Sequence, residues 1–348
     1  MLPTRLCLLA LLLLIATASG AAQAITVAGA GATFPAPAYA KWAEAYRART
    51  GVSVNYQAIG SGGGIKQVKA GTVAFGASDK PLRPRDLAAA GLYQFPTLVG
   101  GIAPIVNLPG ARSGQIRLSA EVLADIYLGR VRRWNAPPIA GLNPGMRLPN
   151  LPITVVHRSD GSGTTFLFTS YLARRSADWA AQVGASDAVA WPTGLGGKGN
   201  DGVSAFVKQT KGSIGYVEYA YAKQNGSTVV ALRNRAGRFV MPGAPAFAAA
   251  AASANWLRSP GNHVLLLDEP APDAWPIAGA TFILVPRHPA DGQEVREALG
   301  FFAWAFSRGD AMAAALDFVP IPAKVETLLI RQWRWLGLTG GASAGGVR

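Results

Sequence analysis

The chain has 348 residues, and 33 Lys or Arg against 19 Asp or Glu give it a formal net charge of +14. Half of the residues are hydrophobic and 15% are charged, which excludes intrinsic disorder and allows a large core. The single cysteine, Cys7, lies in the leader described next, so a disulfide framework, a thiolate metal site and a cysteine nucleophile are excluded from the mature protein.

The N-terminus has the three-part order of a secretory signal peptide. A start ending at Arg5 precedes an apolar run over residues 6–15, and small residues then end in Ala22-Gln23-Ala24. This A-x-A ending is typical of a cleavage site, so we expect residues 1–24 to be removed on export. No later apolar run approaches the ~18 residues of a membrane span. Residues 25–348 are long enough for two domains of about 150 residues each.

Strand and helix patterns alternate along the first part of the mature chain. Tyr39, Trp42 and Tyr46 lie at helical spacing, and Gly51 supplies the stop. A second, shorter helix is expected through Ile65. Strands are expected at residues 25–28, 52–56 and 73–77. This alternation predicts a parallel sheet with crossover helices, an α/β fold.

The middle of the chain repeats this order, and the end returns to long helices. Ser119 is expected to cap a helix, with Glu121 in its first turn. Further strands are expected at residues 102–106, 153–156 and 214–217, and further helices through Leu167 and Tyr171, over 202–209, from Val295 to Phe306 and from Val325 to Leu336. The glycine-rich tail, residues 339–348, is expected to be disordered.

Three loops combine small residues with hydroxyls directly before a predicted helix. They are residues 31–34, 60–63 and 161–164. A helix N-terminus offers free backbone N–H groups and the positive end of the helix dipole, which favour phosphate, sulfate or a carboxylate. One such loop is more often a simple N-cap than a ligand site. Three in one chain predict an anion site.

Two charged residues beside these loops sharpen the prediction. Arg158 could grip an oxyanion through a bidentate contact, or form a surface salt bridge with Asp160. Asp79 follows the third strand and suits a ligand that carries a proton, because a carboxylate accepts that hydrogen bond. Phosphate is partly protonated at neutral pH and sulfate is not, so Asp79 would discriminate between them. The alternative is that Asp79 caps the helix after Pro81.

Other functions find less support in the sequence. The basic segments 130–134 and 331–335 are short, so we expect no nucleic-acid binding. No dinucleotide fingerprint, P-loop or nucleophile elbow is present. The three histidines are scattered, so no metal ligand set is expected. His157 alone, beside the third loop, keeps open the alternative of a secreted phosphatase or other hydrolase that acts on phosphoesters.

Several segments, in order along the chain, resemble the periplasmic phosphate-binding proteins of the PstS family. They are GAGATFPAP at 29–37, NYQAIGS at 55–61, FGASD at 75–79, DIYLG at 125–129, RSDGSGT at 158–164, WPTGLGGKGNDG at 191–202, IGYVEY at 214–219 and WPI at 275–277. The chain departs from the family at Gly62, where many relatives have a second serine, at His157, where a basic residue is common, and at Lys80, where a small residue is usual.

The resemblance implies a two-lobed periplasmic-binding-protein fold of type II. Lobe 1 would comprise residues 25–105 plus 278–338, and lobe 2 residues 106–277. It implies a monomer that is not an enzyme, has no cofactor, captures inorganic phosphate in the periplasm and passes it to the membrane permease of an ABC transporter; a role in adhesion or signalling stays open. The ligand contacts it implies are Thr33, Phe34, Ser61, Asp79, Arg158, Asp160, Ser162, Gly163 and Thr164.

Overall fold

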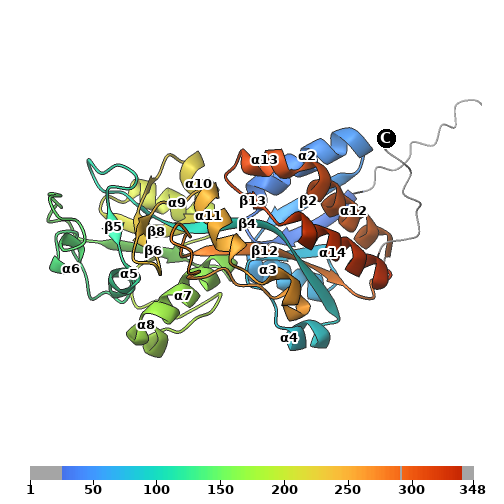
Figure 1. Ribbon diagram of the computed structural model, residues 1–348, viewed down its shortest axis with the longest axis horizontal. Coiled ribbons are helices and arrows are strands. Elements are labelled where there is room, and N and C mark those ends of the chain that lie inside the picture. Colours follow the sequence, from blue (N-terminus) through green and yellow to red (C-terminus); the bar gives the residue numbers. More distant parts are fainter. Residues whose placement is uncertain (1–25, 291, 339–348) are drawn as a thin grey trace, which may run out of the picture.

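The computed structural model describes residues 26–290 and 292–338. The expected signal peptide and the expected disordered tail lie outside the described residues. Two α/β lobes lie at the two ends of a long central strand, β4, and helices cover both faces of the sheet (Figure 1). The first lobe contains the N-terminal and C-terminal elements, and the second contains the middle of the chain.

The strands are β1 Thr26–Gly31, β2 Ser53–Ala58, β3 Phe75–Ser78, β4 Leu92–Val106, β5 Arg117–Leu118, β6 Thr154–Arg158, β7 Leu195–Gly197, β8 Ser213–Glu218, β9 Thr228–Val229, β10 Ala231–Arg233, β11 Phe239–Val240, β12 Ala278–Pro286 and β13 Val319–Pro320. The helices are α2 Ala36–Thr50, α3 Ser61–Lys69, α4 Pro84–Ala89, α5 Ala120–Tyr127, α6 Pro137–Ala140, α7 Gly163–Arg175, α8 Ala177–Gln182, α9 Gly199–Gln209, α10 Tyr219–Gln224, α11 Ala244–Ala252, α12 Gly292–Arg308, α13 Asp310–Ala314 and α14 Ala323–Trp335, with 3₁₀ turns η1 Trp256–Arg258 and η2 Pro260–Asn262.

One sheet passes through both lobes, in the order β2-β1-β3-β12-β4-β8-β6-β7. In lobe 1, β1 pairs in parallel with β2 and β3; in lobe 2, β6 pairs in parallel with β7 and β8. The expected parallel arrangement is therefore present within each lobe. The sheet as a whole is mixed, because β12 runs antiparallel to both β3 and β4.

Strand β4 belongs to both lobes. Its first part, Leu92 to Gly101, pairs with β12, and its last part, Ile102 to Val106, pairs with β8. Every residue of this strand is buried. The strand is much longer than the one expected at residues 102–106. The expectation was too short because Pro96, Gly100 and Gly101 interrupt the apolar pattern that marks a strand in the sequence.

The predicted helix signals around the lobe 1 core are confirmed. Tyr39, Trp42 and Tyr46 are buried on one face of α2. Gly51 ends this helix with a φ of 77°, a left-handed conformation that favours glycine, and its N–H bonds to Arg47 O. Phe302 of α12 packs edge-on against Tyr39, with 5.7 Å between the ring centroids. The N-terminal and C-terminal parts of the chain therefore share one core.

Lobe 2 has its own aromatic core. Tyr216 of β8 stacks on Phe168 of α7 at 4.2 Å between ring centroids, and Tyr127 packs on both. Ser119 caps α5, as expected, by accepting a hydrogen bond from the Val122 N–H. Within the described residues, no helix has the length and apolar character needed to cross a membrane.

One segment of the range assigned to lobe 2 lies against lobe 1. Gln94 of β4 donates to Gly261 O, and Asn262 donates to Gln94 O, both over 2.8 Å. The 3₁₀ turn η2 therefore packs on the lobe 1 half of β4, with η1 beside it, before the chain continues through residues 264–277.

Candidate functional site

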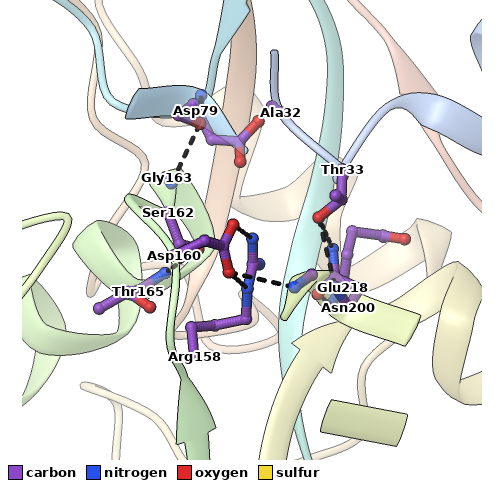
Figure 2. A network of polar contacts seen from close by, with 12 residues as sticks. Ala32, Thr33, Asp79, Arg158, Asp160, Ser162, Gly163, Thr165, Asn200 and Glu218 are labelled. Carbon is purple, nitrogen blue, oxygen red and sulfur yellow. Dashed lines mark hydrogen bonds and ion pairs between the residues drawn. The ribbon is translucent and has the colours of Figure 1, made fainter. Parts of the chain in front are cut away.

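Two edges of the sheet face each other across the candidate site. In lobe 1, parallel strands β1, β2 and β3 end at the same edge and lead into Thr33, Ser61 and Asp79. In lobe 2, parallel strands β6, β7 and β8 likewise end together, next to Arg158 and Asn200. The carboxyl ends of parallel strands are where open α/β sheets bind ligands. Figure 2 shows Asp79 opposite the Arg158–Asp160 pair and Thr33 opposite Asn200.

The second and third anion loops touch each other across the lobes. Ser61, the first residue of α3, accepts a hydrogen bond from the Gly163 N–H over 3.0 Å, and another from the Asp79 N–H over 3.3 Å. The Gly62 N–H donates to Gly161 O over 2.8 Å. The starts of α3 and α7 therefore lie together at the site, each with the positive end of its dipole directed there.

Only glycine fits at two of these positions. A Cβ on Gly163 would lie 2.6 Å from both the Asp79 Cβ and the Ser61 Oγ. A Cβ on Gly60 would lie 2.3 Å from the Asp160 Oδ2, and its φ of 91° is also unfavourable for other residues. These glycines let the two lobes approach each other closely.

Arg158 and Asp160 form a buried bidentate pair. Arg158 Nε donates to Asp160 Oδ1 over 2.7 Å, and Nη2 donates to Oδ2 over 2.5 Å. The alternative of a salt bridge with Asp160 is therefore right about the partner but wrong about the surface, because the Arg158 side chain is 1% exposed. Asp160 Oδ1 also accepts from the Gly199 N–H. Burial alone would raise the pKa of Asp160, but the hydrogen bonds and charge of Arg158 bring it below its usual value.

Two donors at the site have no partner within residues 26–290 and 292–338. Among the described residues, none bonds to Arg158 Nη1 or to Thr164 Oγ1, although both atoms are buried. A buried donor without a partner costs about 1–3 kcal/mol, and more for a charged group. The Ser162 hydroxyl differs, because it accepts from the Thr165 N–H and caps α7. Arg158 and Thr164 therefore have hydrogen bonds to offer to a ligand.

Asp79 is a buried acceptor on the opposite side. It is 1% exposed, and its Oδ1 accepts a hydrogen bond from Thr281 Oγ1 over 2.8 Å. Burial raises its pKa to about 7, although the Thr281 hydrogen bond and the charge of Arg158 act in the other direction. The helix after Pro81 begins at Pro84 with Arg83 at its N-cap, so the alternative of Asp79 as a helix cap is wrong.

The first anion loop is held by lobe 2. Thr33 Oγ1 accepts from Asn200 Nδ2 over 2.8 Å, and Thr33 O accepts from the Tyr221 hydroxyl over 2.7 Å. Phe34 is fully buried and packs against Phe318, with 5.8 Å between the ring centroids. The loop before α2 is thereby fixed between the two lobes.

The structure brings the nine residues named for ligand contact to this one region, on the three loops, at the end of β3 and at the end of β6. Sequence reasoning missed the residues that support them. Thr281 orients Asp79, Asn200 holds Thr33, and the Tyr216 hydroxyl bonds to Thr165 Oγ1 over 2.6 Å. Thr281 is the hydroxyl residue beside the apolar run 282–285, and Asn200 lies within the segment WPTGLGGKGNDG. Their positions in the sequence do not reveal that Thr281 contacts Asp79 or that Asn200 contacts Thr33.

The His157 side chain contacts Trp191 and the backbone of Arg158. Its ring stacks on Trp191 at 4.7 Å between centroids, and Nδ1 bonds to Arg158 O over 3.0 Å. Burial lowers the pKa of His157. Among residues 26–290 and 292–338, no cluster of three or more His, Cys, Asp or Glu side chains could hold a metal ion.

Comparisons with known proteins agree with this architecture. The family model described as a PBP superfamily domain matches residues 16–308. The phosphate-binding protein PstS of Haemophilus influenzae is 51% identical over 302 residues, which are 87% of this chain and 90% of that protein. The PstS protein of Pasteurella multocida is also 51% identical, over 87% of this chain and 88% of its own.

A solved phosphate-binding protein from Stenotrophomonas maltophilia has a similar fold, with a TM-score of 0.65 and 20% sequence identity. The match covers 88% of this chain and 93% of that one. The fold and the two facing strand edges therefore define a two-lobed binding protein of the PBP superfamily, as the sequence predicted. Within that superfamily, the chain belongs to the PstS family of phosphate-binding proteins.

Proposed function

We propose that the protein binds one inorganic phosphate between its lobes and delivers it to the permease of a phosphate ABC transporter. The observation that carries the proposal is the pair of buried, unpartnered donors, Arg158 Nη1 and Thr164 Oγ1, which lie at the same site as the buried acceptor Asp79. This combination suits an oxyanion that accepts several hydrogen bonds and donates one.

The proposed contacts come from both lobes. Lobe 1 supplies the Thr33 hydroxyl, the Phe34 N–H, the Ser61 hydroxyl and Asp79. Lobe 2 supplies the remaining contacts, which are Arg158, Ser162, Gly163 and Thr164, while Asp160 orients Arg158. The bidentate Arg158–Asp160 pair supports this assignment, because it directs the guanidinium and offsets its charge.

Asp79 is proposed to select phosphate over sulfate. In its ionised form this carboxylate accepts a hydrogen bond from the protonated oxygen that phosphate carries near neutral pH. Sulfate has no such proton, and two acceptors facing each other in a buried site repel. Arsenate, which has the same shape and also carries a proton, should bind.

We propose a binding protein and not a phosphoester hydrolase. The relatives are named as binding proteins, and two contacts favour the same conclusion here. Ser162 Oγ accepts the N-cap hydrogen bond of α7, and the His157 ring stacks on Trp191 and bonds through Nδ1 to Arg158 O. No cofactor is proposed. Failure to hydrolyse p-nitrophenyl phosphate, together with tight binding of free phosphate, would distinguish the two functions.

The remaining features follow from the family and the leader. We propose cleavage after Ala24, a periplasmic location, a monomer and a membrane permease as partner, without nucleic-acid binding. The basic segment after α5 supports the last point, because Arg130 is paired with Asp125 and Asp178. We propose lobe boundaries at residues 25–105 plus 278–338 for lobe 1 and 106–277 for lobe 2, with residues 256–263 packed on lobe 1.

Calorimetry on residues 25–348 tests the proposal. The protein is first stripped of bound anion by unfolding and refolding, and phosphate and then sulfate are titrated at the same pH. Tight one-to-one binding of phosphate without binding of sulfate is expected. Absence of phosphate binding, or equal binding of both anions, would overturn the proposed ligand.

A further inference from the structure

We propose that two ion pairs between the lobes, Lys80–Asp187 and Lys223–Asp317, act as latches that slow the opening of the site and so set the rate of ligand release. The inference rests on the proposed function for the identity of the ligand. The contacts themselves are independent of it, because none of these four residues is among the proposed ligand contacts.

The first latch joins two segments that also form the site. Lys80 directly follows Asp79 at the end of β3, and its Nζ lies 2.7 Å from Asp187 Oδ1, in the loop after α8. The backbone oxygen of Asp187 accepts from the Ser162 N–H over 2.8 Å. The backbone of Asp187 therefore positions the start of α7, and its side chain connects the loop after α8 to lobe 1.

Further contacts hold this first pair in place. The Lys80 ammonium lies 5.7 Å from the ring centroid of Phe166, which is one turn into α7, and Ser186 Oγ donates to Asp187 Oδ1 over 3.1 Å. The side chains of Lys80 and Asp187 are 31% and 22% exposed. The lysine therefore has two partners on lobe 2, the Asp187 carboxylate and the Phe166 ring.

The second latch has the opposite polarity. Here lobe 2 supplies the cation, Lys223 in the last turn of α10, and lobe 1 supplies the anion, Asp317 between α13 and β13. Asp317 adopts a left-handed backbone conformation with a φ of 61°. It directly precedes Phe318, which packs on Phe34 of the first anion loop. Each latch therefore joins a segment adjacent to a ligand loop to the opposite lobe.

The elements that flank the two latches lie on opposite sides of β4 in Figure 1: α10 and α13 are drawn above this strand, whereas α4, which follows Lys80, and α8, which precedes Asp187, are drawn below it. Each pair joins lobe 1 to lobe 2, so a movement that separates the lobes at either pair must break that pair. Solvent-accessible ion pairs contribute about 0.2–1 kcal/mol each, which corresponds to a factor of about 1.4 to 5 in rate. The first pair also borders a groove of about 850 Å³, so it is accessible to salt.

Three variants and two controls test the latches on residues 25–348. Lys80→Gln and Lys223→Gln each remove one latch, and the double variant removes both. Arg83→Gln is the matched control for the first, because Arg83 lines the same groove but pairs with Asp86 inside lobe 1. Arg238→Gln is the control for the second, because Arg238 pairs with Asp273 within lobe 2. Release of radiolabelled phosphate is followed after addition of excess unlabelled phosphate.

We expect each lysine variant to release phosphate about 1.4- to 5-fold faster at low ionic strength, and the double variant to show the product of the two factors. These differences should disappear near 0.5 M salt, where the Debye length falls to about 4 Å. The charge-reversed variant Lys80→Asp/Asp187→Lys should return the rate toward wild type. Unchanged release in the lysine variants, or equal acceleration in the controls, would overturn the latches.

If the wild-type protein does not bind phosphate, the proposed function is overturned. The latches are then tested by a second measurement that needs no ligand. Small-angle X-ray scattering then compares the radius of gyration of the wild type and the double lysine variant. A larger radius for the variant at low salt, and equal radii at high salt, would support the latches. Equal radii at low salt would overturn them.

Discussion

Thr281 on β12 donates a hydrogen bond to Asp79 Oδ1 over 2.8 Å, across 202 positions of the sequence. The contact fixes the carboxylate so that its other oxygen, Oδ2, lies toward the start of α7, where a Cβ on Gly163 would be 2.7 Å from it. The acceptor of lobe 1 and the donors of lobe 2 therefore face the same space.

Asp79→Ala should narrow the preference for phosphate over sulfate. Without the carboxylate, the proton of phosphate loses its acceptor, and the repulsion of sulfate by Asp79 disappears. Calorimetric titration of both anions at matched pH measures the ratio of affinities. An unchanged ratio would show that Asp79 is not the selective group. Thr281→Val, which removes only the hydrogen bond to Asp79, should narrow the preference less.

Asp79 should make the ligand-free protein less stable as the pH rises. Its pKa is about 7 in the folded chain and 3.8 in the unfolded chain, so between these values the folded state holds a proton that the unfolded state has released. The contribution of Asp79 to the free energy of unfolding is greatest below about pH 4, and it decreases as the pH rises to about 7. The unfolding free energy of wild type relative to Asp79→Asn should fall by up to ~1.4 kcal/mol per pH unit in urea denaturation.

Glu326 on α14 provides a control for this pH dependence. Burial raises its pKa to about 7, and the nearby charge of Asp310 acts in the same direction. Glu326→Gln should therefore also alter the pH dependence of stability, while leaving phosphate affinity at the wild-type value. If the difference in unfolding free energy between wild type and Asp79→Asn does not change with pH between 4 and 7, the raised pKa of Asp79 is contradicted.

Arg158→Ala should weaken phosphate binding by ~1.5–3 kcal/mol or more, the range for hydrogen bonds to charged groups. Part of this loss arises because Asp160 keeps its negative charge at the site without the guanidinium that offsets it. Arg132→Ala, which removes an exposed arginine of the same lobe, should bind phosphate as wild type does. Wild-type affinity in Arg158→Ala, measured by calorimetry, would refute the assignment of the site.

Thr164→Val should weaken phosphate binding without destabilising the fold. The Thr164 hydroxyl has no partner among the described residues, so its replacement by a methyl group of similar size breaks no hydrogen bond within the protein. We expect ~0.5–1.5 kcal/mol less binding free energy and an unchanged or higher melting temperature. Ser162→Ala is the contrasting variant, because loss of this N-cap should cost ~0.5–2 kcal/mol of stability. A melting temperature lowered by Thr164→Val would indicate a structural role for its hydroxyl.

Gly163→Ala should hold the lobes apart. The added Cβ would lie 2.6 Å from the Asp79 Cβ, which belongs to the other lobe and cannot rotate away. Overpacking of this size costs ~1–3 kcal/mol, and here it opposes closure on the ligand. Gly141→Ala, at a position with a helical φ of −62°, should leave calorimetric phosphate affinity unchanged. Equal affinity in both variants would rule out close approach at Gly163 as a requirement.

Local features of the sequence were sufficient to predict the three loops, their hydroxyls and the helices that follow them. Glycine turns, caps and apolar spacing act over a few residues, so they can be recognised without the fold. Gly51 and Ser119 are examples, because each meets its partner within four positions. The order of the motifs along the chain was in turn sufficient to predict the fold class and the family.

Contacts between distant residues required the tertiary structure. Ser61 meets the Gly163 N–H because two edges of the sheet face each other, and Thr281 meets Asp79 because β12 pairs with β3. The structure also decided which hydroxyl oxygens already accept a bond, since Ser162 Oγ caps its helix whereas Thr164 Oγ1, two residues later, has no partner among the described residues. The availability of a donor depends on every atom around it, and those atoms come from parts of the chain whose proximity no local pattern encodes.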